Sequence, residues 1–295
     1  MRNKYIASLL GFVALAASVG AIGEEAIDGG SAATPKEENS GSYVCAGGKK
    51  GLTYNKICNR LVKIIPGGSV VQTKGSVENV EMLLSKKADI VVAQLDFVAN
   101  DLDKNPENDN EYTLAGELYD ECIHVAVHKD GKVRNEDDLQ SKGVSIAVGK
   151  PGSGTMATWA YLQELESGYK KATPVMKDGP IAFNNLLMSN TSSKGVDAVM
   201  WVTRPSIKGK YTRLVAKNKD LEIISFNDSD LNDTHKVLGV PIYKFKKIPV
   251  EEGTFSDTKV QTPCTSAVLL VRSDREDLLE KVSDIMLSYK SSLVH

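Results

Sequence analysis

Two glycine-rich segments of this chain have the composition of anion-binding turns. They are Gly47-Gly48-Lys49-Lys50-Gly51 and Gly149-Lys150-Pro151-Gly152-Ser153-Gly154-Thr155. A strand-like apolar run precedes each turn and a helical pattern follows it. Backbone N–H groups at the start of a helix carry partial positive charge, and glycine leaves them accessible to a ligand. A plain strand–helix connection would have the same composition, but the duplication favours ligand contact, and the expected chemistry is binding of a small acid.

Other chemistries fit these segments poorly. The second turn lacks the Gly-Lys-Ser/Thr ending of a nucleotide P-loop, because Thr155 follows Gly154 directly. Pro151 occupies the first glycine position of a serine-hydrolase elbow. His124 and His128 lie on a strand pattern, and no Cys-x-x-Cys provides metal-ligand spacing. The sequence therefore predicts a binding protein, with no catalytic residues, metal or cofactor.

The residues around the first turn follow a β-α-β-α-β pattern. Strands are expected at 43–47, 69–73 and 88–93, with a helix before Pro66 and a second helix that has Ser76 at its cap. This pattern predicts a doubly wound α/β sheet, which binds ligands beyond the carboxyl ends of its strands. Lys49, Ser76 and Gln94 lie at or just after the carboxyl ends of these strands, where a ligand is expected.

The pattern repeats around the second turn. Strands are expected at 144–148, 196–202 and 221–226, with helices at 155–165 and 181–188, whereas 100–112 is read as a loop. Two further apolar strands, 122–127 and 266–271, are expected to cross between the lobes before a C-terminal helix over 278–289. The predicted fold is two doubly wound sheets joined by two crossing strands. Lobe one comprises 42–128 and 262–295, and lobe two comprises 129–261.

The N-terminal residues have the pattern of a secretory signal peptide. Arg2 and Lys4 precede an apolar run over 6–19, and Val19-Gly20-Ala21 suits cleavage near Ala21. A retained anchor is the alternative. Residues 22–41 are acidic and without period, as in a disordered spacer. The formal net charge of −2 and the lack of a basic stripe disfavour nucleic acid. We expect a periplasmic monomer.

Four cysteines, an even number, suit disulfides in an exported chain, with free buried thiols as the alternative. Cys45 ends the first strand and Cys58 lies two turns into the next helix, which favours their pairing. Cys122 and Cys264 lie at equivalent points of the two crossing strands, so they form the second expected pair.

Four further residues have side chains suited to a ligand pocket. Asp96 follows Gln94 at a strand end, where its carboxylate would accept from an ammonium group or cap the next helix. Arg204 would hold a carboxylate with its two-pronged guanidinium, or lie on the surface. Trp201 and Tyr54 suit pocket lining and core packing equally well.

Several motifs in order resemble those of the TAXI family, the exported solute receptors of TRAP transporters. They are Gly47-Gly48-x-x-Gly51-x-Thr53-Tyr54, Gly75-Ser76-Val77-Glu78-Asn79, Ala88-Asp89-Ile90, Gln94-x-Asp96, Pro151-Gly152-Ser153-Gly154-Thr155 and Ile248-Pro249-x-x-x-Gly253-Thr254-Phe255. The likeness runs from about 43 to 290. Thr53 and Ile57 in the first helix, and Arg204 before Pro205, depart from the family pattern, so ligand identity is not carried over.

The resemblance implies a two-lobed periplasmic binding protein that captures a glutamate-like amino acid or a dicarboxylate and delivers it to a TRAP-type membrane subunit. A ligand-sensing receptor of the same fold, coupled to a membrane signalling protein, is the alternative. Carried over position by position, the ligand-binding residues are Gly48, Tyr54, Ser76, Asn79, Gln94 and Asp96 from lobe one, and Ser153, Thr155, Trp201 and Arg204 from lobe two.

Overall fold

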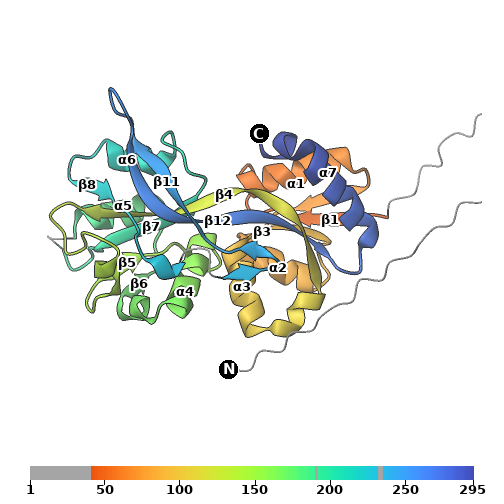
Figure 1. Ribbon diagram of the computed structural model, residues 1–295, viewed down its shortest axis with the longest axis horizontal. Coiled ribbons are helices and arrows are strands. Elements are labelled where there is room, and N and C mark those ends of the chain that lie inside the picture. Colours follow the sequence, from red (N-terminus) through yellow and green to blue (C-terminus); the bar gives the residue numbers. More distant parts are fainter. Residues whose placement is uncertain (1–40, 190–191, 232–234) are drawn as a thin grey trace, which may run out of the picture. The chain divides into compact units, whose positions relative to one another are not determined.

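The computed structural model describes residues 41–189, 192–231 and 235–295, so the predicted signal peptide and nearly all of the predicted spacer lie outside the described residues. The described chain is a mixed α/β body in which helices cover both faces of a ten-stranded sheet (Figure 1). Its strand order is β2-β1-β3-β12-β4-β7-β5-β6, with β11 beside β12 and β8 beside β4.

The first lobe is built from alternating strands and helices. They are β1 (Tyr43–Ala46), α1 (Thr53–Ile64), β2 (Gly68–Val71), α2 (Ser76–Leu84), β3 (Ile90–Gln94) and α3 (Leu95–Lys104). Strands β2 and β3 flank β1, and both pairings are parallel. Parallel strands need crossover helices, so helices lie on both faces of the sheet. Ile90 and Val92 pack with α1 and the C-terminal helix, whereas Val91 and Ala93 pack with α2 and α3.

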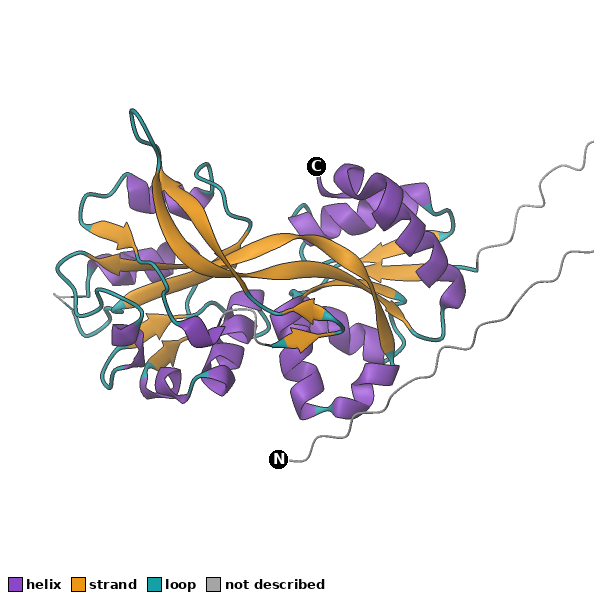
Figure 2. Cartoon of the chain, in the orientation of Figure 1, coloured by secondary structure: helices purple, strands orange, loops and turns teal. Residues whose placement is uncertain are grey.

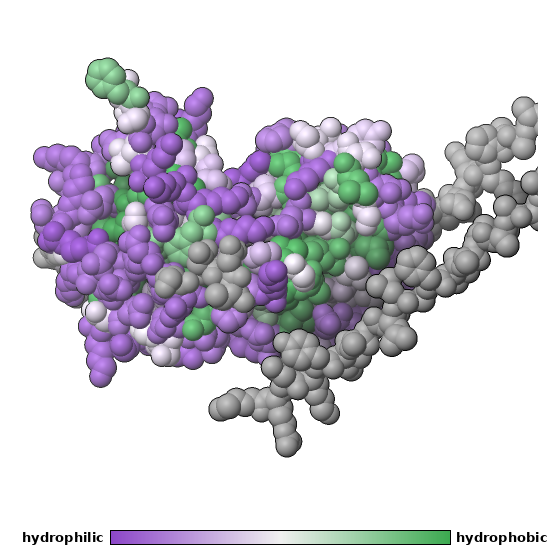
Figure 3. Space-filling view, viewed as in Figure 1, coloured by the Kyte–Doolittle hydropathy of each residue, from purple (hydrophilic) through white to green (hydrophobic). Residues whose placement is uncertain are grey.

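The second lobe repeats this arrangement. It contains β5 (Ser145–Ala147), α4 (Gly154–Leu165), β6 (Thr173–Val175), α5 (Gly179–Leu187), β7 (Ala198–Thr203), α6 (Lys210–Ala216) and β8 (Leu221–Ile223). Strand β5 lies between β6 and β7, parallel to both. Polar side chains cover most of the visible face of this lobe (Figure 3).

Two long antiparallel strands connect the lobes. They are β4 (Tyr112–His128) and β12 (Thr258–Arg272), which run side by side through the middle of the body (Figures 1 and 2). Strand β12 pairs with β3 in lobe one and with β11 (Lys244–Glu251) in lobe two, and β4 pairs with β7. The C-terminal helix α7 (Glu276–Val294) packs on lobe one. The predicted fold class is thus confirmed, with the two lobe sheets joined into one by β4 and β12.

Several elements differ from the sequence-based expectation. The crossing strands are more than twice as long as predicted, and the expected loop over 100–112 contains the end of α3 and a 3-10 turn, η1 (Pro106–Asn110). The sequence analysis did not identify β6, β11, α6 or the short hairpin of β9 (Lys236–Val237) and β10 (Val240–Pro241). These pieces are short or solvent-facing, so their hydrophobic period is weak. Three other 3-10 turns are η2 (Asp137–Gln140), η3 (Ser167–Lys171) and η4 (Ser229–Leu231).

No helix within the described residues combines the length and apolarity needed to span a bilayer.

Two disulfides join the cysteines in the predicted pairs. Cys45 on β1 bonds to Cys58 on α1, with their Cα atoms 5.6 Å apart. Cys122 bonds to Cys264 between directly paired positions of β4 and β12. The first disulfide ties a helix to its own sheet, and the second fastens the two crossing strands where they pass from lobe to lobe.

The two disulfides should differ in their contribution to stability. The Cys122–Cys264 bond closes a loop with a sequence separation of 142 residues, against 13 for Cys45–Cys58. Chain-entropy arguments then give losses of about 5 and about 3 kcal/mol when each pair is replaced by serine. Urea unfolding of C122S/C264S and C45S/C58S under non-reducing conditions measures both. Equal losses would contradict the loop-length argument.

Candidate functional site

A cavity of about 330 Å³ lies at the junction of the two lobes. It opens at the carboxyl ends of β1, β3 and β7 and at the start of three helices, α1, α2 and α4. This is where ligands bind to open α/β sheets. The lining residues are Gly47, Gly48, Lys49, Leu52, Thr53, Tyr54, Lys74, Gly75, Ser76, Gln94, Glu121, Ser153, Gly154, Thr155, Val202 and Thr203.

The three helix N-termini make the cavity electropositive. Within the described residues, no side chain caps the first turn of α1 or of α2. On α4 the Ser153 hydroxyl accepts from the Met156 N–H (3.3 Å). Uncapped N–H groups and the helix dipole favour an anion here, and the exposed Lys49 and Lys74 add positive charge at the rim.

A chain of hydrogen bonds holds the first glycine-rich turn in place. The Gly48 N–H donates to the Thr73 hydroxyl (2.9 Å), and this hydroxyl donates to the side-chain oxygen of Asn79. The Asn79 amide nitrogen in turn donates to the Val92 carbonyl (2.6 Å). Asn79 is completely buried and therefore supports the cavity wall from behind. The turn reaches β3 through this network, so its shape is fixed before any ligand arrives.

Gln94 is the most informative lining residue. It ends β3, its backbone N–H donates to the Ser76 hydroxyl (3.0 Å), and the residue is only 3% exposed. Its side-chain nitrogen is buried without a hydrogen-bond partner in the described chain. A buried amide left unpaired is costly, and native proteins rarely tolerate one. Because Gln94 lines the cavity, a ligand oxygen that reached this nitrogen would satisfy the donor.

The lobes approach each other closely across the cavity at glycines. A Cβ atom added to Gly154 would lie 1.7 Å from the Gln94 side-chain oxygen, and one added to Gly75 would lie 3.3 Å from the Gly152 carbonyl oxygen. Gly75 also has a φ of +147°, which glycine adopts readily. Gly75 therefore has a backbone conformation that favours glycine, and any side chain at position 154 would require the Gln94 side chain or α4 to move.

A single carboxylate, that of Glu121 on β4, lines the cavity among the residues that the structure describes. Its Oε2 accepts from the Tyr54 hydroxyl (2.8 Å), which projects from the first turn of α1. Burial raises the pKa of the Glu121 carboxyl to about 7. The Tyr54 hydrogen bond opposes this shift, whereas the nearby negative charge of Asp96 adds to it.

The structure brings six of the ten sequence-predicted residues to the cavity, namely Gly48, Tyr54, Ser76, Gln94, Ser153 and Thr155. Ser76 is the first residue of α2 and not its expected cap, because Gly75 occupies that position. The Thr155 hydroxyl accepts from the Val202 N–H (3.2 Å) and thereby ties α4 to β7. The other four residues, Asn79, Asp96, Trp201 and Arg204, lie elsewhere.

Asp96 lies behind the cavity wall and is completely buried. Its carboxylate accepts from the Phe97 N–H (2.8 Å) in the first turn of α3, although Gln94 and not Asp96 occupies the cap position of that helix. It also accepts from the Thr158 hydroxyl (2.6 Å) on α4 and the Tyr243 hydroxyl (3.0 Å). Burial raises the pKa of Asp96, and the two hydroxyls oppose that shift. Asp96 therefore links the lobes and does not line the cavity.

Trp201 and Arg204 point away from the cavity for geometric reasons. Side chains alternate along β7, so Val202 lines the cavity while Trp201 packs with Phe183 and Tyr211 in the core of lobe two. The Arg204 guanidinium lies 4.4 Å from the centre of the Tyr119 ring and donates to the Val294 carbonyl (3.3 Å). Arg204 thus holds the end of α7, and the guanidinium contact expected for a ligand carboxylate is absent from the cavity lining described.

Glu121 is the main lining residue that the sequence analysis missed. The signal was a lone acidic residue at the edge of the apolar run 122–127. The expected strand began one residue later, at 122, so the sequence did not predict that Glu121 lies on the strand and lines the cavity. In the described part of the chain, no group of His, Cys, Asp or Glu has the arrangement of a metal site.

Comparisons with known proteins identify one matching family and several solved structures with a related fold. A sequence model of the NMT1-like family matches residues 45–286. Similar solved structures include a putative L-cystine ABC transporter from Listeria monocytogenes, at 12% identity and a TM-score of 0.48, with 84% of this chain and 89% of that chain matched. A mutant of ArgBP from T. maritima is similar at 17% identity and a TM-score of 0.43, with 85% of this chain and 90% of that chain matched.

The periplasmic domain of BvgS from B. pertussis is also similar, at 14% identity and a TM-score of 0.46, with 86% of this chain matched. The match spans only 42% of that domain. At such identities the ligands of these proteins say nothing about the ligand of this chain.

Glu121 should make the ligand-free protein less stable as pH rises. Its folded pKa of about 7 exceeds the value of about 4.3 in an unfolded chain, so the folded state binds the extra proton between these values. Stability should fall by about 2.5 kcal/mol between pH 5 and pH 8 from this group. Urea unfolding of wild type and Glu121→Gln at both pH values measures it.

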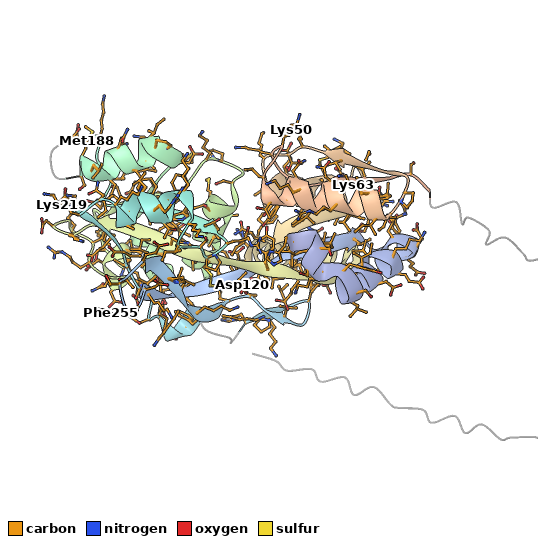
Figure 4. All side chains as sticks on the ribbon, turned by 90° about the horizontal axis from the view of Figure 1, so that it is seen from above. Lys50, Lys63, Asp120, Met188, Lys219 and Phe255 are labelled. Atoms are coloured by element: carbon orange, nitrogen blue, oxygen red, sulfur yellow. A yellow bond between two sulfur atoms is a disulfide. The ribbon has the colours of Figure 1, made fainter. Side chains whose placement is uncertain are left out.

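The matched control is Asp120→Asn, since Asp120 neighbours Glu121 on β4 but pairs with Lys246 outside the cavity (Asp120 is labelled in Figure 4). Asp120→Asn should keep the wild-type difference between the two pH values, and Glu121→Gln should reduce it. The same difference in all three proteins would exclude Glu121 as its source.

Proposed function

Because the chain belongs to the NMT1-like family, we propose that it is an exported solute-binding protein that captures a small organic acid between its two lobes. The ligand class is a glutamate-like amino acid or a dicarboxylate. The chain acts by binding and not by catalysis. Its leader pattern and its two disulfides support export to an oxidising compartment.

One observation carries this proposal. The buried side-chain nitrogen of Gln94 has no partner among the described residues, and Gln94 lines a cavity on which the N-termini of α1, α2 and α4 converge. Every one of these groups is a hydrogen-bond donor. A carboxylate is the common biological group that accepts several such bonds at once and also gains from helix dipoles.

The two lobes supply different parts of the binding site. Ser76, Gln94 and the α1 turn come from lobe one, whereas Ser153, Gly154 and Thr155 come from lobe two. A ligand that touches both sets favours the arrangement in which the glycine turns meet, and it shifts the protein toward that state only by its difference in affinity between the two states. Closure also removes water, which strengthens the charged hydrogen bonds.

Delivery of the ligand to a TRAP-type membrane subunit is the transport role that we propose. The support is the ordered set of motifs shared with the TAXI receptors, of which Gly75-Ser76 and Pro151-Gly152-Ser153-Gly154-Thr155 form the facing turns of the cavity. Shared motifs that meet at one cavity are stronger support for a shared binding function than shared motifs scattered over the surface.

A thermal-shift screen tests the proposed function. Acidic amino acids or small dicarboxylates should raise the melting temperature, and a ligand at 100 times its dissociation constant should add about 2.7 kcal/mol of stability. Neutral sugars and cationic amino acids serve as controls. Stabilisation by the control compounds alone would reject an acid-binding function.

The close approach of the lobes predicts a strong effect of Gly154→Ala. The added methyl group would meet the Gln94 side-chain oxygen, so either Gln94 or α4 must move and the closed state is disfavoured. We expect acid affinity to fall at least about tenfold, or about 1.4 kcal/mol. Titration calorimetry measures this loss.

Gly41→Ala is the matched control, because none of the described residues lies within 4 Å of a Cβ added at Gly41. It should bind as wild type does. Wild-type affinity in Gly154→Ala would show that the bound state lacks the Gln94–Gly154 contact.

A further inference from the structure

The charge distribution in the cavity is not that of a site built only for anions. Helix N-termini, the Gln94 amide and two lysines would all suit a dicarboxylate. Glu121 breaks this pattern, because it places a carboxylate in the same wall. A second ligand carboxylate near an ionised Glu121 would be repelled in a partly buried site.

The structure holds Glu121 in position without neutralising it. The Tyr54 hydroxyl donates to its Oε2 (2.8 Å), and Thr265 of β12 lies opposite it in the sheet. No ion pair joins Glu121 to a lysine or arginine within the described chain. The charge of the nearby Arg204 lowers the pKa of Glu121 without forming an ion pair with it. A cationic ligand group would be a direct partner and would stabilise this half-buried carboxylate further.

The groups that face Glu121 come from four elements. They are Tyr54 on α1, Asp96 on α3, Tyr119 on its own strand and Arg204 after β7. Asp96 is negative when ionised, and the two tyrosines are neutral. The Arg204 guanidinium is engaged by the Tyr119 ring and the Val294 carbonyl, at the end of α7. These surroundings leave Glu121 as the acceptor in the cavity for a positive group.

We propose that Glu121 is the specificity-determining residue of the cavity, accepting the ammonium group of an amino-acid ligand whose carboxylate lies at the helix N-termini. The inference rests on the proposed acid-binding function and narrows it. An ionised Glu121 selects an amino acid over the same acid without its amino group. A protonated Glu121 is an O–H donor without negative charge, so it holds the ammonium group less strongly and tolerates a second carboxylate.

Selectivity should therefore depend on pH. The amino acids keep their charges between about pH 6.5 and about pH 8, and over the same interval succinate and glutarate remain mostly dianions because their last proton binds below about pH 6. Burial raises the pKa of Glu121 into this interval, with Tyr54 opposing the shift. Among the groups that face it, the two tyrosines have raised pKa values and stay protonated. A change with pH in the ratio of the amino-acid affinity to the dicarboxylate affinity then reports on the protonation of Glu121 or Asp96. The Glu121→Gln variant shows which of the two carboxyl groups is responsible.

Titration calorimetry with two matched pairs tests the proposal, L-glutamate against glutarate and L-aspartate against succinate. At pH 8, wild type should prefer the amino acid of the better-binding pair at least about tenfold, as expected for a buried charge pair. At about pH 6.5, where most of Glu121 is protonated, this preference should shrink several-fold. Glu121→Gln should lose the preference at pH 8 and its pH dependence, whereas Asp120→Asn should retain both.

Three results would overturn the proposal. Equal affinity of wild type for both members of the bound pair at pH 8 would do so, without the need for any variant to fold. An unchanged preference in a folded Glu121→Gln would do so as well. If none of the four acids binds to folded wild type, this proposal and the acid-binding function fail together, whereas the first two results leave the function standing.

Discussion

The pairing of β4 with β12 is the interaction on which the rest of the structure depends. Both strands run through both lobes, and their register places Cys122 opposite Cys264 and Glu121 opposite Thr265. One lobe sheet is built on the β3–β12 edge and the other on the β4–β7 edge. A slip of one residue would turn each side chain to the other face. The disulfide therefore fixes the position at which Glu121 enters the cavity.

The contacts between the lobes are of two physical kinds. At the cavity, glycines allow the backbone of one turn to approach the other lobe directly, as at Gly75 and Gly154. Behind it, the buried Asp96 carboxylate accepts hydroxyl hydrogen bonds from Thr158 and Tyr243. The glycine contacts form only when the two turns meet. If Thr158 and Tyr243 moved away, the buried Asp96 carboxylate would lose two hydrogen-bond donors, which is unfavourable for a buried charge. Both therefore favour the same arrangement of the lobes.

The elements and the cavity follow from sequence patterns more readily than the roles of individual side chains. Apolar runs predict β3 and β7, and glycine turns at strand ends predict where the cavity lies. Whether a polar residue lines it depends on strand alternation and on partners distant in sequence. Trp201 lies one residue from Val202 and yet faces the opposite side of the sheet. Asn79 has a side chain that could bind a ligand, but its oxygen accepts from Thr73 and its nitrogen donates to the Val92 carbonyl.

Glu121 shows why a carboxylate can be useful in a site that attracts acids. Donors alone would bind any small anion, including inorganic ions, because helix N-termini provide charge without shape. A fixed negative group at the far wall adds a penalty for the wrong ligand, and specificity commonly needs such a repulsive element. The cost is a destabilised ligand-free protein when Glu121 is ionised. That cost is recovered when a cationic group enters, so the energy stored in the empty cavity contributes to selective binding.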